Sequence, residues 1–390
     1  MFQIKKKLAI ITTHPIQYNA PLFQLLNERG NIDLKVFYTW GQSKEGPLYD
    51  PGFNKTFAWD IPLTEGYIHE FIKNISNKPG TKSFFGIINK GLIKNIKKYD
   101  PDAILIFGWS FYSHLKLIIH FAGKAKIIFR GDSTLLNEPN HFSIKKLLRR
   151  IFLKWVYSHV DYSLYVGKAN KDYFIAHGLR NNQLHFAPHA IDNLRFIGDD
   201  DLLNEKASKW RIKLGFAKEN IVLLFAGKLE YVKAPDILIR EFLSTTSQNL
   251  RLLIVGNGEM ESNLREMASN DNRIVFLDFQ NQKTMPILYR MADIFVLPSR
   301  SETWGLAINE AMSSGRPVIV SDKVGCHLDL VQRRITGFIF NSSKPEELTR
   351  IMDELSSKEM LNEMGLQAKQ KTLEYNYEKT CKTIEQILNA

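Results

Sequence analysis

Two glutamates, Glu302 and Glu310, bracket a Trp-Gly turn near the end of the chain. The apolar run 294–297 before them is typical of a buried strand, and the run 306–314 is typical of a helix. A helix N-terminus beside a glycine offers backbone N–H groups and a positive dipole end to a phosphate. Carboxylates accept hydrogen bonds from vicinal hydroxyls such as those of ribose. The segment therefore fits a nucleotide-sugar, and the alternative is a solvated helix with two ordinary glutamates.

A pair of lysines, Lys228 and Lys233, follows another apolar run, 221–225, and a turn at Gly227. Their ammonium groups can neutralise the two phosphates of a leaving nucleoside diphosphate. No cluster with metal-ligand spacing is visible nearby, so we expect neither a metal ion nor another cofactor. The alternative is two surface lysines without a ligand.

Apolar runs alternate with helical patterns along the whole chain. This alternation predicts parallel sheets covered by helices on both faces. A chain of 390 residues is too long for one core, and a polar, turn-rich break at 198–201 divides it. We therefore expect two α/β domains, whose strands are 8–12, 34–38, 103–107, 126–129, 162–166, 221–225, 252–255, 274–277, 294–297 and 318–321.

Several ordered motifs resemble those of retaining glycosyltransferases of family 4. They are the Glu-x7-Glu spacing at 302–310, Ala-Gly-Lys with a second lysine at 226–233, Leu-Ile-Val-Gly-Asn-Gly at 253–258 and Tyr-Arg-Met-Ala-Asp at 289–293. The resemblance is close over 160–340 and looser elsewhere. It implies the GT-B fold, in which two Rossmann-like parallel-sheet domains face each other across a cleft.

The resemblance also implies a division of labour between the domains. Residues 1–197 would bind the acceptor, 198–372 would bind the nucleotide-sugar, and a C-terminal helix in 373–390 would cross back to the first domain. The insertion at 39–86, rich in aromatic and turn residues, is either a functional loop or a packed structural insert.

Site roles follow from the resemblance, residue by residue. Glu302 would contact the transferred sugar, the N–H groups of Gly305 and Leu306 would bind the distal phosphate, and Glu310 would bind ribose. The expected catalytic residues are Glu302, Lys228 and Lys233, and the expected donor-binding residues are Gly227, Phe279, Gln280, Trp304, Gly305, Leu306 and Glu310. The base would lie near Phe279 and Gln280.

This chain departs from the family at two of these positions. Lys228 stands where the family has Arg, which keeps the charge but loses the bidentate fork. Asp278 stands where many relatives have Gly, so the base is open beyond a preference for UDP.

The first domain has fewer signals. His14, Gln17 and Asn19 follow the first strand, where many relatives carry a glycine-rich turn. Arg130 and Asp132 follow the strand 126–129, without the histidine that relatives have there, so no catalytic role is transferred. We take these five residues as candidates for acceptor or cleft contacts, with a loop histidine satisfied by its neighbours as the alternative.

Charge is uneven along the chain. The formal net charge is +11, and residues 1–200 carry all of it, because basic and acidic residues balance in 201–390. Residues 144–156 predict a basic amphipathic helix of the kind that lies on membranes, and 85–96 predict a weaker second one. The alternative is that both helices pack their apolar faces on the sheet. No signature of nucleic-acid binding accompanies the charge.

Other features of the sequence bear on location. No run is long enough to span a bilayer, and the apolar run at 8–11 is too short for a signal peptide. Two cysteines fit a reducing compartment. We expect a cytoplasmic protein, with peripheral contact to an anionic inner membrane face left open.

These expectations describe a metal-independent, retaining glycosyltransferase of the hexosyltransferase type. It would move a sugar from a nucleotide-sugar, UDP-linked by preference, to a hydroxyl of a glycan or lipid-linked acceptor in surface polysaccharide or glycoconjugate assembly. A sugar-nucleotide epimerase of the same fold and a catalytically idle binding subunit are the alternatives. The epimerase would not need the two glutamates, and the intact lysines argue against an idle subunit.

Overall fold

The computed structural model describes residues 5–41, 47–136, 138, 143–355 and 357–390. Contacts divide them into two compact units. Unit 1 holds the described residues of Met1–Gly46, Pro62–Pro188 and Tyr377–Ala390, and unit 2 those of Pro47–Ile61 and His189–Asn376. The sequence analysis assigned 47–61 to the first domain, whereas they belong to unit 2. Residues 42–46 of the expected insertion lie outside the described residues.

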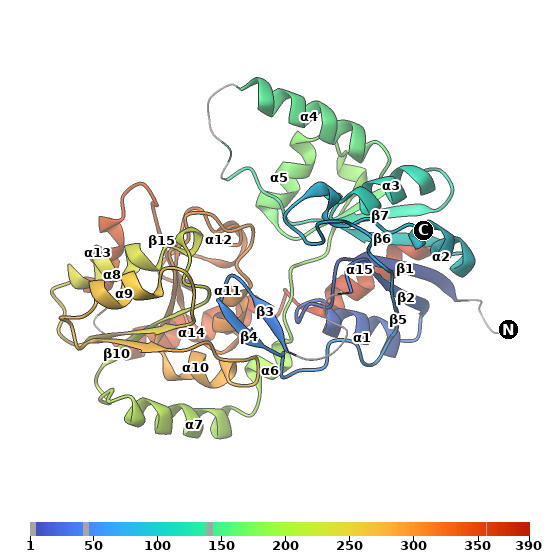
Figure 1. The fold of residues 1–390 in the computed structure, drawn as a ribbon. Helices are drawn as coiled ribbons and strands as arrows, with labels where there is room; N and C mark the ends of the chain where they lie inside the picture. Colours follow the sequence, from blue (N-terminus) through green and yellow to red (C-terminus); the bar gives the residue numbers. More distant parts are fainter. Residues whose placement is uncertain (1–4, 42–46, 137, 139–142, 356) are drawn as a thin grey trace. The chain divides into compact units, whose positions relative to one another are not determined.

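Unit 1 is built on a seven-stranded parallel sheet with the order β5-β2-β1-β6-β7-β8-β9. One face packs against α1 and α15, and the other is covered by α2, α3, α4 and α5 (Figure 1). The strands are β1 (Lys6–Thr12), β2 (Ile32–Tyr38), β5 (Ile68–Phe71), β6 (Ala103–Phe107), β7 (Lys126–Arg130), β8 (Tyr162–Tyr165) and β9 (Leu184–Phe186). The helices are α1 (Ala20–Glu28), α2 (Leu92–Tyr99), α3 (Tyr112–Phe121), α4 (Ile144–Tyr157), α5 (Lys168–Ala176) and α15 (Tyr377–Asn389), with short turns η1 (Phe84–Gly86) and η2 (Asn181–Gln183).

Unit 2 is built on a six-stranded parallel sheet with the order β12-β11-β10-β13-β14-β15. Its strands are β10 (Ile221–Ala226), β11 (Leu250–Val255), β12 (Ile274–Leu277), β13 (Ile294–Leu297), β14 (Val318–Ser321) and β15 (Gly337–Phe340). A separate antiparallel hairpin joins β3 (Leu48–Asp50) to β4 (Lys55–Phe57). The helices are α6 (Asn193–Ile197), α7 (Asp200–Lys213), η3 (Tyr231–Lys233), α8 (Pro235–Leu243), α9 (Glu261–Met267), α10 (Met285–Met291), α11 (Leu306–Ser313), α12 (His327–Leu330), α13 (Glu346–Asp353) and α14 (Lys358–Thr372).

The ten expected strands are all present, and their burial explains their sequences. Every residue of β10 and of β13 is buried, because helices cover both faces of the sheet. Strands of that kind are continuous apolar runs and do not alternate with polar residues. The expectation of an α/β fold with parallel sheets is confirmed.

The amphipathic helix expected over 85–96 is confirmed only from Leu92 onward, and its first part is wrong. The chain forms the short turn η1, then extended backbone, and the helix α2 begins only at Leu92. Gly86 passes so close to Gly80 that a Cβ would lie 2.1 Å from the Gly80 carbonyl oxygen, so this packing requires glycine at position 86. Leu92 and Ile96 are buried in the core.

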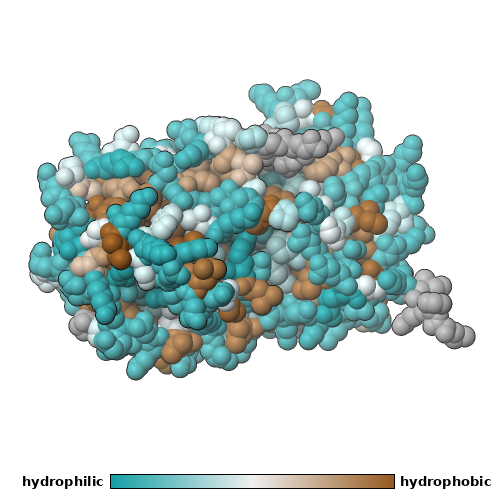
Figure 2. All heavy atoms as spheres, turned by 90° about the horizontal axis from the view of Figure 1, so that it is seen from below, coloured by the Kyte–Doolittle hydropathy of each residue, from teal (hydrophilic) through white to brown (hydrophobic). Residues whose placement is uncertain are grey.

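Among the described residues, the structure contains no helix with both the length and the apolar character that crossing a membrane requires. The face drawn in Figure 2 is mainly hydrophilic, and its apolar residues form small scattered groups.

Candidate functional site

The candidate site of unit 2 lies where the strand order reverses. In the order β12-β11-β10-β13, the chain leaves β10 in one direction and β13 in the other, which opens a crevice at their carboxyl ends. Lys228 follows β10, and Glu302 follows β13. Ligands of open parallel sheets bind at such switch points.

Two of the three expected catalytic side chains are in contact. The Lys233 ammonium, at the end of η3, donates to Oε2 of Glu302. Both side chains are largely shielded, with 25% and 15% of their surface exposed. The Glu302 backbone is held by a bond from its N–H to the Lys323 carbonyl at 3.1 Å and another from the Gly325 N–H at 3.0 Å. A cation and an anion that could face a polar ligand are thus fixed together.

An ion pair that the sequence analysis missed holds these two loops. The Arg300 guanidinium binds both carboxylate oxygens of Asp236, at 2.9 and 2.6 Å, and donates to the Tyr231 carbonyl at 2.7 Å. Burial alone would raise the pKa of Asp236, but the Arg300 guanidinium lowers it below its usual value. Arg300 lies two residues before Glu302, so this pair positions the Lys233–Glu302 contact.

The start of α11 has the backbone form expected of an anion-binding helix. Its N-cap, Gly305, adopts a left-handed conformation with φ of 99°. A Cβ there would lie 3.0 Å from the Val324 side chain and 3.2 Å from that of Leu297, so only glycine fits without adjustment. The Ile308 N–H donates to the Gly305 carbonyl at 2.9 Å, and the N–H groups of Leu306 and Ala307 before it have no preceding helical carbonyl to accept them.

Glu310 and Trp304 are more enclosed than their expected roles require. Glu310 is 2% exposed, and its Oε2 accepts from the Tyr289 hydroxyl at 2.7 Å. Trp304 is 3% exposed, and its indole N–H donates to Asn309 Oδ1 at 2.9 Å. Its ring packs on Tyr375. Trp304 therefore supports the start of α11 from inside, and ribose binding by Glu310 stays a prediction.

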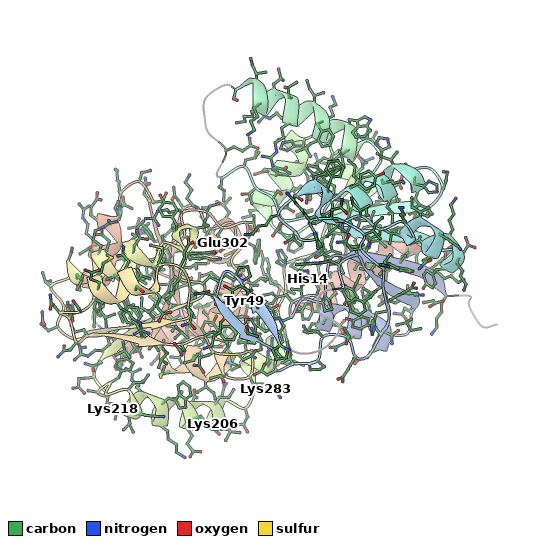
Figure 3. The ribbon with its side chains drawn as sticks, in the orientation of Figure 1. His14, Tyr49, Lys206, Lys218, Lys283 and Glu302 are labelled. Carbon is green, nitrogen blue, oxygen red and sulfur yellow. The ribbon has the colours of Figure 1, made fainter. Side chains whose placement is uncertain are left out.

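Lys228 and Gly227 lie in a turn packed tightly against the turn after β11. A Cβ at Gly256 would come 2.0 Å from the Gly227 carbonyl oxygen, and one at Gly258 would come 2.5 Å from the Leu229 carbonyl. The two glycines of the 253–258 motif thus let the backbones approach. The Lys228 ammonium binds Asp50 of the hairpin at 3.0 and 3.2 Å, and Figure 3 marks the neighbouring Tyr49.

The expected base-binding segment follows β12. The Phe279 N–H donates to Asn257 Oδ1 at 2.9 Å, and the Gln280 amide donates to the Asp278 carbonyl at 3.0 Å. The Phe279 ring packs against Phe57 of the hairpin, with ring centres 4.3 Å apart. Base recognition by Phe279 and Gln280 stays a prediction.

The candidates in unit 1 follow β1 and β7 at the carboxyl edge of its sheet. His14, labelled in Figure 3, is half-buried beside Thr13 and Trp40, and Gln17 and Asn19 are also half-buried. Asp132 is half-buried after β7.

Arg130 is instead an interior residue of unit 1. It is 6% exposed, and its guanidinium donates to the carbonyls of Ala187 at 2.9 Å and Pro188 at 3.1 Å. Burial lowers its pKa to about 10, so it stays charged at neutral pH. Its observed contacts fix the segment by which the chain leaves unit 1.

A buried histidine of unit 1 also escaped the sequence analysis. Nδ1 of His114 lies 3.0 Å from the Gly108 carbonyl, and Nε2 lies 2.9 Å from the Thr39 hydroxyl. Burial lowers its pKa to about 4, so it is neutral at physiological pH. The ring joins the loops after β6 and β2, and a lone histidine on an apolar helix offers no sequence signal of this.

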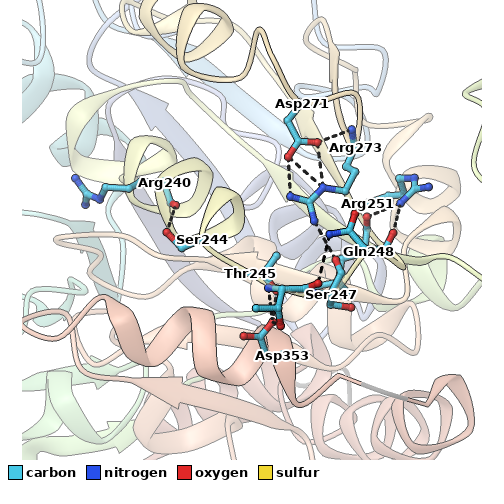
Figure 4. Close-up of polar contacts among 11 residues, drawn as sticks. Arg240, Ser244, Thr245, Ser247, Gln248, Arg251, Asp271, Arg273 and Asp353 are labelled. Carbon is cyan, nitrogen blue, oxygen red and sulfur yellow. Dashed lines mark hydrogen bonds and ion pairs between the residues drawn. The ribbon is translucent and has the colours of Figure 1, made fainter.

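A cavity of about 670 Å³ lies elsewhere in unit 2, at the amino end of β12. Polar contacts beside it, drawn in Figure 4, are internal: Arg273 binds Asp271 and donates to the Ser247 carbonyl at 2.9 Å. The cavity is at the other end of the strand from Phe279. Over the described parts of the chain, no three His, Cys, Asp or Glu side chains gather in a way that could hold a metal ion.

The architecture defines the class of protein. Two units, each a parallel sheet wound by helices, constitute the GT-B fold. Solved structures with this arrangement include Anabaena HepE in complex with UDP and glucose, with a TM-score of 0.72, 19% identity and coverage of 98% of this chain and 99% of that one. Sucrose-phosphate synthase from Thermosynechococcus elongatus has a TM-score of 0.74, 14% identity and coverage of 99% and 98%.

Sequence comparison finds relatives of unit 2 among glycosyltransferases. Residues 206–371 match the model of the family described as "Glycosyl transferases group 1". An uncharacterized glycosyltransferase of Methanocaldococcus jannaschii is 31% identical over 163 residues, 41% of this chain and 42% of that protein. D-inositol 3-phosphate glycosyltransferase of Nocardia farcinica is 32% identical over 172 residues, 40% and 38%. The chain thus spans about two fifths of the length of these curated relatives.

Proposed function

We propose that this chain is a retaining glycosyltransferase that transfers a sugar from a UDP-linked donor to a hydroxyl of a glycan or lipid-linked acceptor. The observation that carries the proposal is the Lys233–Glu302 contact at the switch point of unit 2, beside the start of α11. The family match over 206–371 and the relatives' names favour the same class. The UDP complexes of Anabaena HepE favour a UDP-linked donor.

Each group would have a distinct task in this reaction. The bond from the anomeric carbon to the phosphate oxygen breaks, and a bond to the acceptor oxygen forms on the same face of the sugar. Negative charge grows on the leaving diphosphate, which takes the acceptor proton. Lys228, Lys233 and the N–H groups that begin α11 stabilise that charge, so no metal ion is required. Glu302, oriented by Lys233, binds hydroxyls of the transferred sugar, and Glu310 binds ribose.

Nucleotide binding tests the donor site first. Thermal unfolding is measured with UDP, GDP and ADP, for the wild type and for Glu310→Ala. A nucleotide at 100 times its Kd adds about 2.7 kcal/mol to stability. We expect UDP to stabilise the wild type and to lose most of this effect in the variant. Because Glu310→Ala also removes the acceptor of the Tyr289 hydroxyl, the ligand-induced shift is compared, and not the Tm itself. Absence of a shift with all three nucleotides contradicts the proposal.

Turnover tests the reaction class. Glu302→Gln keeps the size of the side chain and removes its charge, so we expect at least a 100-fold loss of kcat with UDP affinity kept. NMR of the product gives its anomeric configuration, which should be that of the donor. Chelation with EDTA should leave the rate unchanged. A changed sugar in the absence of acceptor would identify an epimerase, and binding without any turnover would identify an idle subunit.

The helix α4 favours an acceptor at the cytoplasmic face of an anionic membrane. Its apolar side chains are exposed, including Ile144 at 70%, Leu148 at 61% and Ile151 at 59%. The buried face of α4 is a different one, which includes Leu153 and Val156. The same helix carries five basic residues, Lys145, Lys146, Arg149, Arg150 and Lys154. Lys146 and Arg150 lie 3.2 and 4.0 Å from the Glu138 carboxylate, and Arg149 donates to the Tyr173 hydroxyl at 3.2 Å. An exposed apolar stripe on a basic helix complements an anionic lipid surface. Acceptors of surface polysaccharide or glycoconjugate assembly are met on such a surface.

Vesicle sedimentation tests this membrane contact. We expect binding to vesicles with phosphatidylglycerol and loss of binding in Leu148→Glu. Ile212→Glu in α7 is the matched control, because Ile212 is 77% exposed on a helix without this pattern. Equal sedimentation of the wild type and Leu148→Glu contradicts the assignment, and equal binding to neutral vesicles removes the role of charge.

A further inference from the structure

The β3–β4 hairpin carries a carboxylate to the expected phosphate-binding lysine. Asp50 Oδ1 and Oδ2 lie 3.0 and 3.2 Å from the Lys228 ammonium, and the Phe53 ring lies 5.1 Å from the same ammonium. Burial would raise the pKa of Asp50, but hydrogen bonding to Lys228 lowers it below its usual value. The carboxylate is therefore charged at neutral pH, as a phosphate would be.

The same hairpin carries aromatic rings to the expected base-binding residue. Ring centres of Phe57 and Phe53 lie 4.3 and 4.7 Å from that of Phe279. Trp59 extends the cluster, 5.0 Å from Phe57. A nucleic-acid base stacks on an aromatic side chain in the same way.

The remaining hairpin contacts are polar and half-exposed. The Asn281 amide donates to the Ala58 carbonyl at 2.7 Å, and the Lys283 N–H donates to the Asp60 carboxylate at 3.1 Å. The Lys55 ammonium lies 3.6 Å from Oδ2 of Asp278. Gly52 permits the close approach, because a Cβ there would lie 2.5 Å from the Lys228 nitrogen. Half-exposed contacts of this type are individually weak, so a ligand that competes for them can release the hairpin.

We propose that residues 48–60 are an intramolecular ligand of the donor site, with Asp50 in the place of a phosphate and the rings of Phe53 and Phe57 in the place of the base. A nucleoside diphosphate must displace this hairpin in order to bind. The inference rests on the proposed function, since it takes Lys228 and Phe279 as donor-binding residues.

The first test separates the charge from the fold of the hairpin. Asp50→Asn keeps Oδ1, which accepts from the N–H groups of Gly52 at 2.7 Å and Phe53 at 3.2 Å, and so keeps the turn. Calorimetric titration should show UDP binding about three- to fivefold tighter, as expected for loss of one competing half-exposed ion pair. The affinity for uridine, which has no phosphate, should rise as well, because the same hairpin covers the base position; a gain for UDP alone would reflect only the loss of charge repulsion and would overturn the inference. Asp172→Asn, an equal change of charge at an exposed position of α5, should change neither affinity.

The second test follows the hairpin itself. UDP should move Trp59 from the ring cluster into water, which shifts its fluorescence to the red. Trp59→Phe should lose that part of the signal and keep the part from the other tryptophans. Phe57→Leu should bind uridine more tightly, because the competing ring is gone.

The outcomes distinguish the two proposals. UDP binding that Lys228→Ala weakens but Asp50→Asn leaves unchanged overturns the hairpin inference and keeps the proposed function. Weaker UDP binding by Asp50→Asn also overturns it, since Asp50 would then support the ligand. UDP binding by Asp50→Asn that is three- to fivefold tighter than by the wild type supports the inference. No UDP binding by either protein refutes the proposed function, and the inference falls with it.

Discussion

Removal of the Arg300 guanidinium should loosen the loops that bring Lys233 to Glu302. In Arg300→Met, Asp236 loses two hydrogen bonds of 2.9 and 2.6 Å, and the Tyr231 carbonyl loses one of 2.7 Å. Hydrogen bonds to charged groups contribute about 1.5–3 kcal/mol each when well shielded. The two side chains are 24% and 19% exposed, which reduces the total through solvent screening. We expect a loss of about 2 kcal/mol in the free energy of unfolding.

That loss should appear in both stability and catalysis. For a unit of about 200 residues, about 2 kcal/mol corresponds to a fall of roughly 4–8 °C in Tm. Turnover and UDP affinity should both fall, because Arg300 touches the loops that carry Glu302, expected at the sugar, and Lys233, expected at the diphosphate. Arg334→Met is the control, since the Arg334–Glu354 pair is 66% and 48% exposed and should matter by less than about 0.5 kcal/mol.

The contribution of the Arg300–Asp236 ion pair to the free energy of unfolding should depend on pH. The folded-state pKa of Asp236 lies below its ordinary value, so its contribution is complete above about pH 4 and is lost as pH falls through the folded pKa. The stability difference between wild type and Arg300→Met should therefore be full at pH 7 and shrink in acid. Chemical denaturation at several pH values measures this. An equal difference at pH 7 and pH 3, or none at pH 7, would show that the ion pair does not hold these loops.

Three further substitutions have clear expected results. Gly305→Ala forces a left-handed alanine against Val324 and should cost about 2 kcal/mol and weaken UDP binding, measured by denaturation and calorimetry. Gly256→Ala places a Cβ 2.0 Å from a carbonyl oxygen and should cost more than about 3 kcal/mol, seen as loss of cooperative unfolding. Glu385→Gln breaks the two-bond pair with Arg29, both at 2.8 Å, and should cost about 1–2 kcal/mol. Because Arg29 lowers the pKa of Glu385, that cost should be present at pH 7 and shrink as the pH falls through the lowered folded-state pKa in pH-dependent denaturation.

The interior strands of the two large sheets were all predictable, whereas of their four edge strands only β12 was. Strands with neighbours on both sides, such as β10 and β13, must be apolar throughout, and that is a signal in the sequence. The missed strands of the two large sheets are β5, β9 and β15, which all lie at sheet edges. An edge strand meets fewer apolar neighbours and tolerates polar residues such as His69 and Glu70 of β5.

The parts of the candidate site that lie within a sequence motif were predictable. The contacts between residues far apart in the sequence were not. The positions of Glu302, Lys228 and Lys233 followed from strand-loop-helix patterns, which determine the end of the sheet at which a side chain lies. Asp50 could not be assigned, because it is 178 residues from Lys228 in sequence and belongs to an irregular insertion. The apolar spacing over 85–96 predicted one continuous helix, although two glycines interrupt it. Apolar periodicity carries no information about the close backbone contact that Gly86 makes.

The two units differ in whether their candidate residues are positioned by the backbone fold or by individual loop side chains. In unit 2 the strand order brings Lys228 and Glu302 to one switch point although β10 and β13 are distant in sequence, and tight glycine turns fix the loops that carry them. In unit 1 the corresponding turn after β1 has no glycine, and its polar side chains are half-buried. Any ligand there would be recognised by side chains such as His14, and these change readily without change of fold. If the proposed function holds, donor binding should depend on the fold of unit 2, whereas acceptor choice should depend on the individual loops of unit 1.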